Sequence, residues 1–158
     1  MHNKPIKLAL LVISGYFGFI LMKKLLTDKS EEIDILARTI WGEARGEGTT
    51  GMQAVANVIT NRVKANIWYG ASYKEVCLKP YQFSCWNESD PNRAKILSVN
   101  DSDQIFKNAL YIAEKAVNGT LPDITLGANH YHRYNVSPSW ADINKITVGI
   151  GNHIFYKL

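Results

Sequence analysis

Fifteen consecutive uncharged residues, 8–22, stand near the amino terminus between Lys7 and Lys23. As a helix this run spans roughly 22 Å, short of the roughly 30 Å hydrocarbon layer of a membrane, although flanking lysines can extend its reach. The run separates two parts of unlike charge: residues 1–29 hold five lysines against one acid, whereas residues 30–158 hold 13 basic and 13 acidic residues. Because the larger part is neutral, a nucleic-acid-binding surface is not expected.

Three interpretations of the uncharged run compete. A cleaved secretory signal would be followed by a small-x-small site, but Met22-Lys-Lys-Leu-Leu26 is a poor match. A buried core helix fits badly with a position at the extreme terminus. We therefore expect a transmembrane signal anchor over residues 8–22, within an amino-terminal segment 1–29. It would hold an exported domain in the periplasm at the inner membrane, and its weak hydrophobicity would allow release.

Apolar residues repeat at spacings of three and four in the body of the chain, which predicts several helices. We expect them to begin at a Ser30 cap and end near residue 45, and to cover 49–65, 72–77 and 103–118. Residues 78–102 are rich in turn formers, and the tail from residue 128 favours short strands. The predicted fold class is mainly α (α+β), one domain over 30–158 with a small β portion near the carboxy terminus.

Two cysteines, Cys77 and Cys85, lie eight residues apart. In an exported protein they could close a small disulfide loop, and the even count agrees with this. The alternative is two free buried thiols. No CxxC motif is present, so a zinc knuckle or a thioredoxin-like site is not expected.

Glu43 is a candidate general acid, because it lies in the last turn of an apolar helix. Burial beside core residues would raise its pKa, as proton donation at neutral pH requires. Glu47 would share the same face if the helix continued, and its charge would raise one pKa further. The alternative is an exposed helix end with two solvated acids balanced by Arg45.

Three histidines raise the question of a metal. His130 and His132 point to one side if residues 130–132 form a strand, and with His153 they could supply three nitrogens to zinc. We favour histidines that hydrogen-bond or line a groove, and expect neither a metal nor another cofactor. The sequence contains no HExxH, no GxSxG and no glycine-rich phosphate loop, which argues against metalloproteases, serine hydrolases and nucleotide enzymes.

Aromatic and amide side chains are concentrated in the predicted loops and tail. Aromatic faces pack on sugar rings and amides bind hydroxyl and acetamido groups, although part of the set could instead fill a small core. The set comprises Tyr81, Gln82, Phe83, Trp86, Asn129, Tyr131, Tyr134 and Trp140.

Several motifs in order resemble the SleB/CwlJ-type cell wall hydrolases, a family named for spore cortex-lytic enzymes. The resemblance covers about residues 33–157. The motifs are Leu36-Ala-Arg-Thr-Ile-Trp-Gly-Glu-Ala-Arg-Gly-Glu47, Gln53-Ala-Val-Ala-Asn-Val-Ile-Thr-Asn-Arg-Val63, Gln82-Phe-Ser84, Gly127-Ala-Asn-His-Tyr131, Pro138-Ser-Trp140 and Ile150-Gly-Asn-His-Ile-Phe-Tyr156.

The resemblance implies a lysozyme-like domain that cuts the glycan strand of peptidoglycan. Glu43 matches the essential acid of the family, several members of which are lytic transglycosylases with a single acid. Glu47 matches a recurrent glutamate that would tune Glu43 or bind substrate. By the same resemblance, groove residues that bind substrate would be Gln82, Ser84, Asn129, Tyr131, Trp140 and His153.

The chain also departs from the family. Thr50 stands where many members carry a glutamate, and an anchor stands where many carry a wall-binding domain. An anchor followed by a wall-cutting domain resembles the signal-anchor endolysins of bacteriophages, so we expect a monomer that lyses a host cell. The alternatives are a bacterial membrane-anchored wall-remodelling enzyme and a peptidoglycan-binding protein without catalysis.

Overall fold

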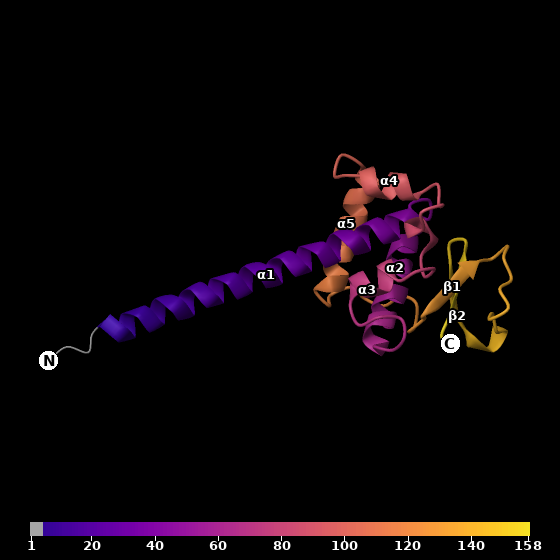
Figure 1. Cartoon of the computed structure of the whole chain (residues 1–158). Helices are drawn as coiled ribbons and strands as arrows, with labels where there is room; N and C mark the ends of the chain where they lie inside the picture. Colours follow the sequence, from indigo (N-terminus) through magenta and orange to yellow (C-terminus); the bar gives the residue numbers. More distant parts are fainter. Residues whose placement is uncertain (1–4) are drawn as a thin grey trace. The chain divides into compact units, whose positions relative to one another are not determined.

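The computed structural model describes residues 5–158, with side chains from residue 17 onward. Its helices are α1 (Pro5–Ala44), α2 (Gly48–Ala65), α3 (Tyr73–Leu78), α4 (Arg93–Ser98) and α5 (Gln104–Val117), and its short 3-10 turns are η1 (Ser84–Trp86) and η2 (Ile143–Lys145) (Figure 1). The strands are β1 (His130–Arg133), β2 (Ile146–Ile150) and β3 (His153–Tyr156). The prediction of a mainly helical fold with a small β portion near the carboxy terminus is confirmed.

The chain divides into two compact units, one ending at Glu31 and one covering Glu32–Leu158. The first unit is helical over residues 5–31. Residues 8–16 of the predicted anchor lie outside the residues whose side chains are described. Among the described residues, no helix has the length and apolar character needed to cross a membrane.

Helix α1 runs through Ser30 without interruption, so the predicted helix start at this residue is wrong. The segment 27–30 contains neither glycine nor proline. Extending an existing helix by one residue fixes one residue per hydrogen bond, whereas a new helix must form a costly first turn. A good cap residue therefore does not begin a helix where the preceding residues are already helical.

The second unit is built on a core shared by the carboxy-terminal part of α1 with α2 and α5. Their apolar stripes are buried as the periodicity predicted, with Leu36, Ile40, Val55, Ile59, Phe106 and Ala109 among the core residues. Helix α5 begins one residue after its cap, Asp103, whose side chain accepts a hydrogen bond from the Phe106 N–H at 2.8 Å. The helices expected over 49–65, 72–77 and 103–118 are present to within a residue or two at each end.

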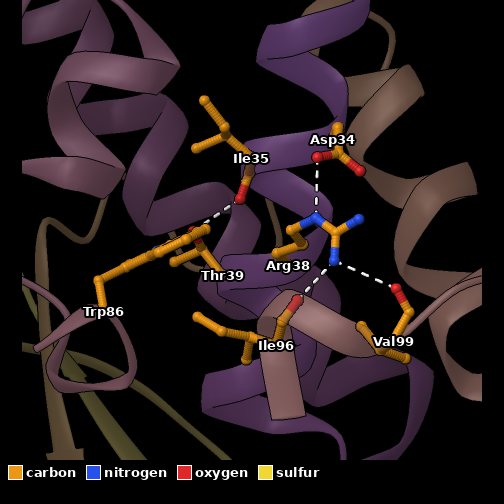
Figure 2. Close-up of polar contacts among 7 residues, drawn as sticks. All are labelled: Asp34, Ile35, Arg38, Thr39, Trp86, Ile96 and Val99. Atoms are coloured by element: carbon orange, nitrogen blue, oxygen red, sulfur yellow. Dashed lines mark hydrogen bonds and ion pairs between the residues drawn. The ribbon is translucent and has the colours of Figure 1, made fainter. Parts of the chain in front are cut away.

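The turn-rich stretch 78–102 contains η1 and α4, which the sequence did not indicate, and polar contacts hold it to α1 (Figure 2). The Arg38 guanidinium donates to the carbonyl oxygens of Ile96 at 2.5 Å and Val99 at 3.1 Å, and to the Asp34 carboxylate at 2.8 Å. These carbonyls lie at the carboxy-terminal end of α4, where backbone oxygens lack helical partners. Arg38 thus holds the carboxy-terminal part of the stretch 78–102 to α1.

The amino-terminal part of the stretch 78–102 is held to α1 by Trp86. Its indole Nε1 donates to the Thr39 hydroxyl at 2.9 Å, and that hydroxyl donates to the Ile35 carbonyl oxygen at 2.8 Å (Figure 2). Thr39 is fully buried, so both of its hydrogen-bonding roles are satisfied inside the protein. The loop is therefore an ordered wall of the second unit.

The tail forms short strands, as expected, and Figure 1 labels β1 and β2. The strands make one antiparallel sheet in the order β1-β3-β2. His130 pairs with Tyr156, and Arg133 pairs with His153. Phe155 packs with Ala128 and with Ala54 and Val58 of α2, which places one face of the sheet on that helix. The sheet thereby presents β1 to the end of α1.

Cys77 and Cys85 are both buried and free, so the disulfide alternative is wrong. Cys77 lies in α3, whereas Cys85 lies in η1. Burial raises the pKa of the Cys77 thiol to about 12, and it also raises the pKa of the Cys85 thiol. Both therefore stay protonated at neutral pH.

Candidate active site

A groove with a cavity volume of about 510 Å³ opens in the second unit, between the end of α1, the loop after α3 and strand β1. Five of the eight residues predicted to form the site line this groove: Glu43, Gln82, Ser84, Tyr131 and Trp140. We call it the Glu43 groove, and its complete lining is Glu43, Arg62, Trp68, Lys79, Pro80, Tyr81, Gln82, Phe83, Ser84, His130, Tyr131 and Trp140.

Three donors hold the Glu43 carboxylate. The Tyr131 hydroxyl donates to Oε2 at 2.9 Å, and both the backbone N–H and the thiol of Cys85 donate to the same carboxylate. Burial raises the pKa of Glu43 above its ordinary value of 4.5, and the charge of Asp90 adds to this, while the three hydrogen bonds act in the opposite direction. Burial dominates, so Glu43 keeps its proton to higher pH than an exposed glutamate and can donate it.

Tyr131 is held so that its hydroxyl meets Glu43. Its ring stacks on Phe155, with 5.7 Å between centroids, and meets the edge of His153 at 5.2 Å. Burial raises the pKa of the Tyr131 phenol well above 10.0, so the hydroxyl remains a donor. His153 is buried and does not line the groove. Its place is behind Tyr131, where it supports the ring.

Arg62 organises the floor of the groove, although it is not among the site residues predicted from the sequence. The guanidinium donates to the Gln82 side-chain oxygen at 3.0 Å and to the Asn129 carbonyl oxygen at 2.8 Å, and it lies over the rings of Tyr69 and Phe83. Burial lowers its pKa from 12.5, and nearby groups act against this shift. The sequence signal that could have identified Arg62 is its position within the apolar stripe of the helix predicted over 49–65.

The Gln82 amide joins two walls of the groove. Its oxygen accepts from Arg62, and its nitrogen donates to the Tyr69 carbonyl oxygen at 2.8 Å. Ser84 is exposed at the start of η1. Both residues line the groove. Gln82 offers an amide that is held on both sides, and Ser84 offers an exposed hydroxyl that also hydrogen-bonds the Asp90 side chain.

Glu47 does not share a face with Glu43, because α1 ends at Ala44. Its carboxylate accepts hydrogen bonds from the Asn152 backbone N–H at 3.0 Å and the Asn152 side-chain amide at 3.1 Å, which lower its pKa below 4.5. Glu47 therefore holds the β2–β3 turn and lies outside the residues that line the groove.

Asn129 also lies outside the groove lining. Its side chain donates to the Leu158 carbonyl oxygen at 2.8 Å and accepts from the Leu158 N–H at 2.9 Å. Both halves of the amide thus bind the carboxy-terminal residue. The structure gives Asn129 a role in holding the chain end beside β1.

His130 and His132 point to one side of β1, as the strand prediction required, because both rings contact Trp140 at centroid distances of 5.2 Å and 5.6 Å. The nitrogens of His132 are 2.7 Å from the Arg133 carbonyl oxygen and 2.8 Å from the Tyr156 hydroxyl. Within residues 17–158, no three metal-ligating side chains come together. The zinc alternative thus has no structural support in this region.

Comparison with known proteins identifies the family. The sequence profile of the cell wall hydrolases matches residues 46–156. The chain belongs to the cell wall hydrolase family. It is a peptidoglycan-cleaving enzyme of this family, which confirms the resemblance found in the sequence motifs.

Solved structures extend the likeness to most of the chain. The catalytic domain of the Bacillus cereus SleB protein is similar at 27% identity and a TM-score of 0.63, over 81% of this chain and 91% of that one. The catalytic domain of the germination-specific lytic transglycosylase SleB from Bacillus anthracis is similar at 29% identity and a TM-score of 0.61, over 80% and 93%. No curated protein matches the chain.

Proposed function

We propose that this enzyme cleaves peptidoglycan glycan strands as a lytic transglycosylase, with Glu43 as both general acid and general base. The observation that supports this most is the acid content of the Glu43 groove. Among the described residues that line it, Glu43 is the one carboxylic acid. Hydrolysis with retention or inversion ordinarily uses two carboxyl groups, whereas internal transfer to a substrate hydroxyl needs one.

The proposed reaction has two proton transfers. Protonated Glu43 gives its proton to the glycosidic oxygen, and the bond from that oxygen to C1 of the muramic acid breaks. The resulting Glu43 carboxylate accepts the proton of the 6-hydroxyl as that oxygen bonds to C1. The products are a 1,6-anhydromuramic end and a free hydroxyl on the departing sugar, and no water is consumed.

The surroundings of Glu43 suit this sequence. Burial favours the protonated form needed in the first step, and the donors from Tyr131 and Cys85 stabilise the carboxylate formed by that step. Trp140 is partly exposed in the groove and offers a face on which a sugar ring can stack.

The test is product analysis with the full-length chain acting on purified peptidoglycan. Mass spectrometry should find anhydromuramic ends, one water lighter than reducing ends, and reducing ends in their place would refute the transglycosylase. Glu43→Gln keeps the size of the side chain and should lower the rate by at least about a thousandfold. Glu47→Gln, the same change four residues away, should retain activity within a few fold and serves as the matched control.

We further propose that the enzyme is a monomer held at the inner membrane through residues 8–22 and acts in host lysis as an endolysin. The support is the uncharged run between Lys7 and Lys23, which precedes the catalytic domain. Cell fractionation tests the attachment. Protein that moves from the membrane to the soluble fraction at unchanged mass after an uncoupler is added would support a releasable anchor, whereas permanent retention would indicate a wall-remodelling enzyme.

A further inference from the structure

A second hollow, which we call the side pocket, lies next to the Glu43 groove and has a cavity volume of about 560 Å³. The two share Lys79, Pro80 and Tyr81 as wall residues. Tyr81 is 90% exposed and has a φ of 65°, in the left-handed region that non-glycine residues seldom adopt. The remaining residues of the side pocket are Leu78, Trp86, Asn87, Glu88 and Ser89.

The wall of the side pocket is fixed in place while its polar groups are free. Trp86 is anchored by its hydrogen bond to Thr39, and the Asn87 N–H donates to the Ser84 carbonyl oxygen at 2.8 Å. In the part of the chain that the structure describes, the side chains of Asn87, Glu88 and Ser89 make no hydrogen bond to protein. Three hydrogen-bonding groups on a fixed wall are available to a ligand.

The side pocket carries both signs of charge. Lys79 is its one cation and Glu88 its one anion among the lining residues. The Lys79 ammonium donates to the Trp68 carbonyl oxygen and lies 5.5 Å from the centroid of the Trp68 ring, which fixes its position. A ligand that suits this wall is a polar chain with a carboxylate and an ammonium group.

The substrate of the proposed function has such a chain. In peptidoglycan the peptide stem is attached to the muramic acid ring, and C1 of that same ring reacts at Glu43. The stem therefore leaves the Glu43 groove close to the reacting bond. It carries amides and carboxylates and, where it contains a diamino acid, a free ammonium.

We propose that the side pocket binds the peptide stem of the muramic acid whose glycosidic bond is cleaved. Glu88 pairs with the ammonium of the stem, Lys79 with a carboxylate, and Asn87 and Ser89 bind its amides. Tyr81 separates the sugar in the Glu43 groove from the stem in the side pocket. This assignment rests on the proposed function of the Glu43 groove and adds that the enzyme favours peptide-bearing strands over bare ones.

The test compares three soluble substrates with the full-length enzyme: uncrosslinked glycan strands with stems that contain a diamino acid, the same strands with stem amines acetylated, and the same strands with stems removed by an amidase. Glu88→Gln should lower kcat/KM about threefold on the first substrate, and Asn87→Ala combined with Glu88→Gln about tenfold. Asp101→Asn, which removes an exposed carboxylate outside both cavities, is the matched control and should change nothing.

On acetylated strands the wild type should fall to the rate of Glu88→Gln, and on bare strands the two should be equal. A loss of equal size on all three substrates would overturn the proposal, because it would make the side pocket a sugar site. Equal rates of wild type and variants on the first substrate would overturn it too. Glu43→Gln separates the two proposals. This variant should lose activity on every substrate, so activity that it retains would count against the catalytic role of Glu43 and not against the side pocket.

Discussion

Gly42 lets the last turn of α1 approach the loop that carries Cys85. A Cβ added at Gly42 would lie 3.0 Å from the Cys85 Cβ, 3.0 Å from the Ile96 Cγ2 and 3.1 Å from the Cys85 Sγ. All three distances are shorter than ordinary van der Waals contact. The substitution Gly42→Ala therefore pushes Cys85 away from the helix, together with the two donors that Cys85 aims at Glu43.

Two opposing contributions set the size of the effect on stability. Alanine in place of glycine in a helix interior stabilises by about 1 kcal/mol, and overpacking a core destabilises by about 1–3 kcal/mol. We expect a net loss of about 1 kcal/mol, which lowers the melting temperature by roughly 2–4 °C in a chain of this size. Because misplacing a catalytic group by about 1 Å can cost on the order of a hundredfold in rate, kcat should fall at least about tenfold.

Thermal unfolding followed by circular dichroism and the rate of glycan cleavage measure the two effects. Gly46→Ala is the matched control, because a Cβ there meets nothing within 4 Å and its φ is not in the left-handed region. It should change the free energy of unfolding by less than about 0.5 kcal/mol. A Gly42→Ala variant that melts at or above the wild-type temperature with full activity would refute the packing described here.

Three further results are expected. Because burial raises the pKa of Glu43, activity should be present at low pH and lost as pH rises through that pKa. Tyr131→Phe removes a hydrogen-bond donor to the Glu43 carboxylate, so the alkaline limb of the pH–activity profile should move to higher pH while kcat falls. Trp68→Ala should lower kcat/KM roughly tenfold by removing an exposed ring of the groove, and Ile67→Ala, next to it and outside the lining, should not; equal effects in the two variants would argue against sugar stacking at Trp68. At pH values above 4.5, Glu47→Gln should lower the free energy of unfolding by less than about 1 kcal/mol, with a small drop in melting temperature. The difference from wild type should vanish as pH falls through the lowered pKa of Glu47. A difference that persists in acid would show that the Asn152 contacts do not depend on the charge of Glu47.

Local patterns in the sequence were sufficient for α2 and α5, and they offered Glu43 as a candidate acid. Apolar spacing placed α2 and α5 to within a residue or two. The end of an apolar helix made Glu43 a candidate buried acid beside the alternative of a solvated helix end, and the burial of Glu43 decides between the two. Both predictions depend on residues a few positions apart, where backbone geometry fixes which side chains share a face.

What the sequence could not provide depends on contacts between distant segments. Whether Glu47 faced Glu43 depended on where α1 ends, and helix ends are set by packing as much as by propensity. The role of His153 as support for Tyr131 follows from the β1–β3 register, and that of Arg62 from the loop that brings Gln82 to it. Short segments such as α4 were missed because Arg38, 58 residues earlier in the chain, supplies the partner for the Ile96 carbonyl.

The hydrogen bond from Tyr131 to Glu43 joins residues 88 positions apart, and the contact of Asn152 with Glu47 spans 105 positions. Closing such long loops is entropically costly, so the site is completed only after the carboxy-terminal strands dock on α2. A nascent chain carries Glu43 early in synthesis, but it lacks the phenol that orients the acid and the strand that walls the groove. The active site is thus inert until the carboxy-terminal strands have been synthesised and have docked.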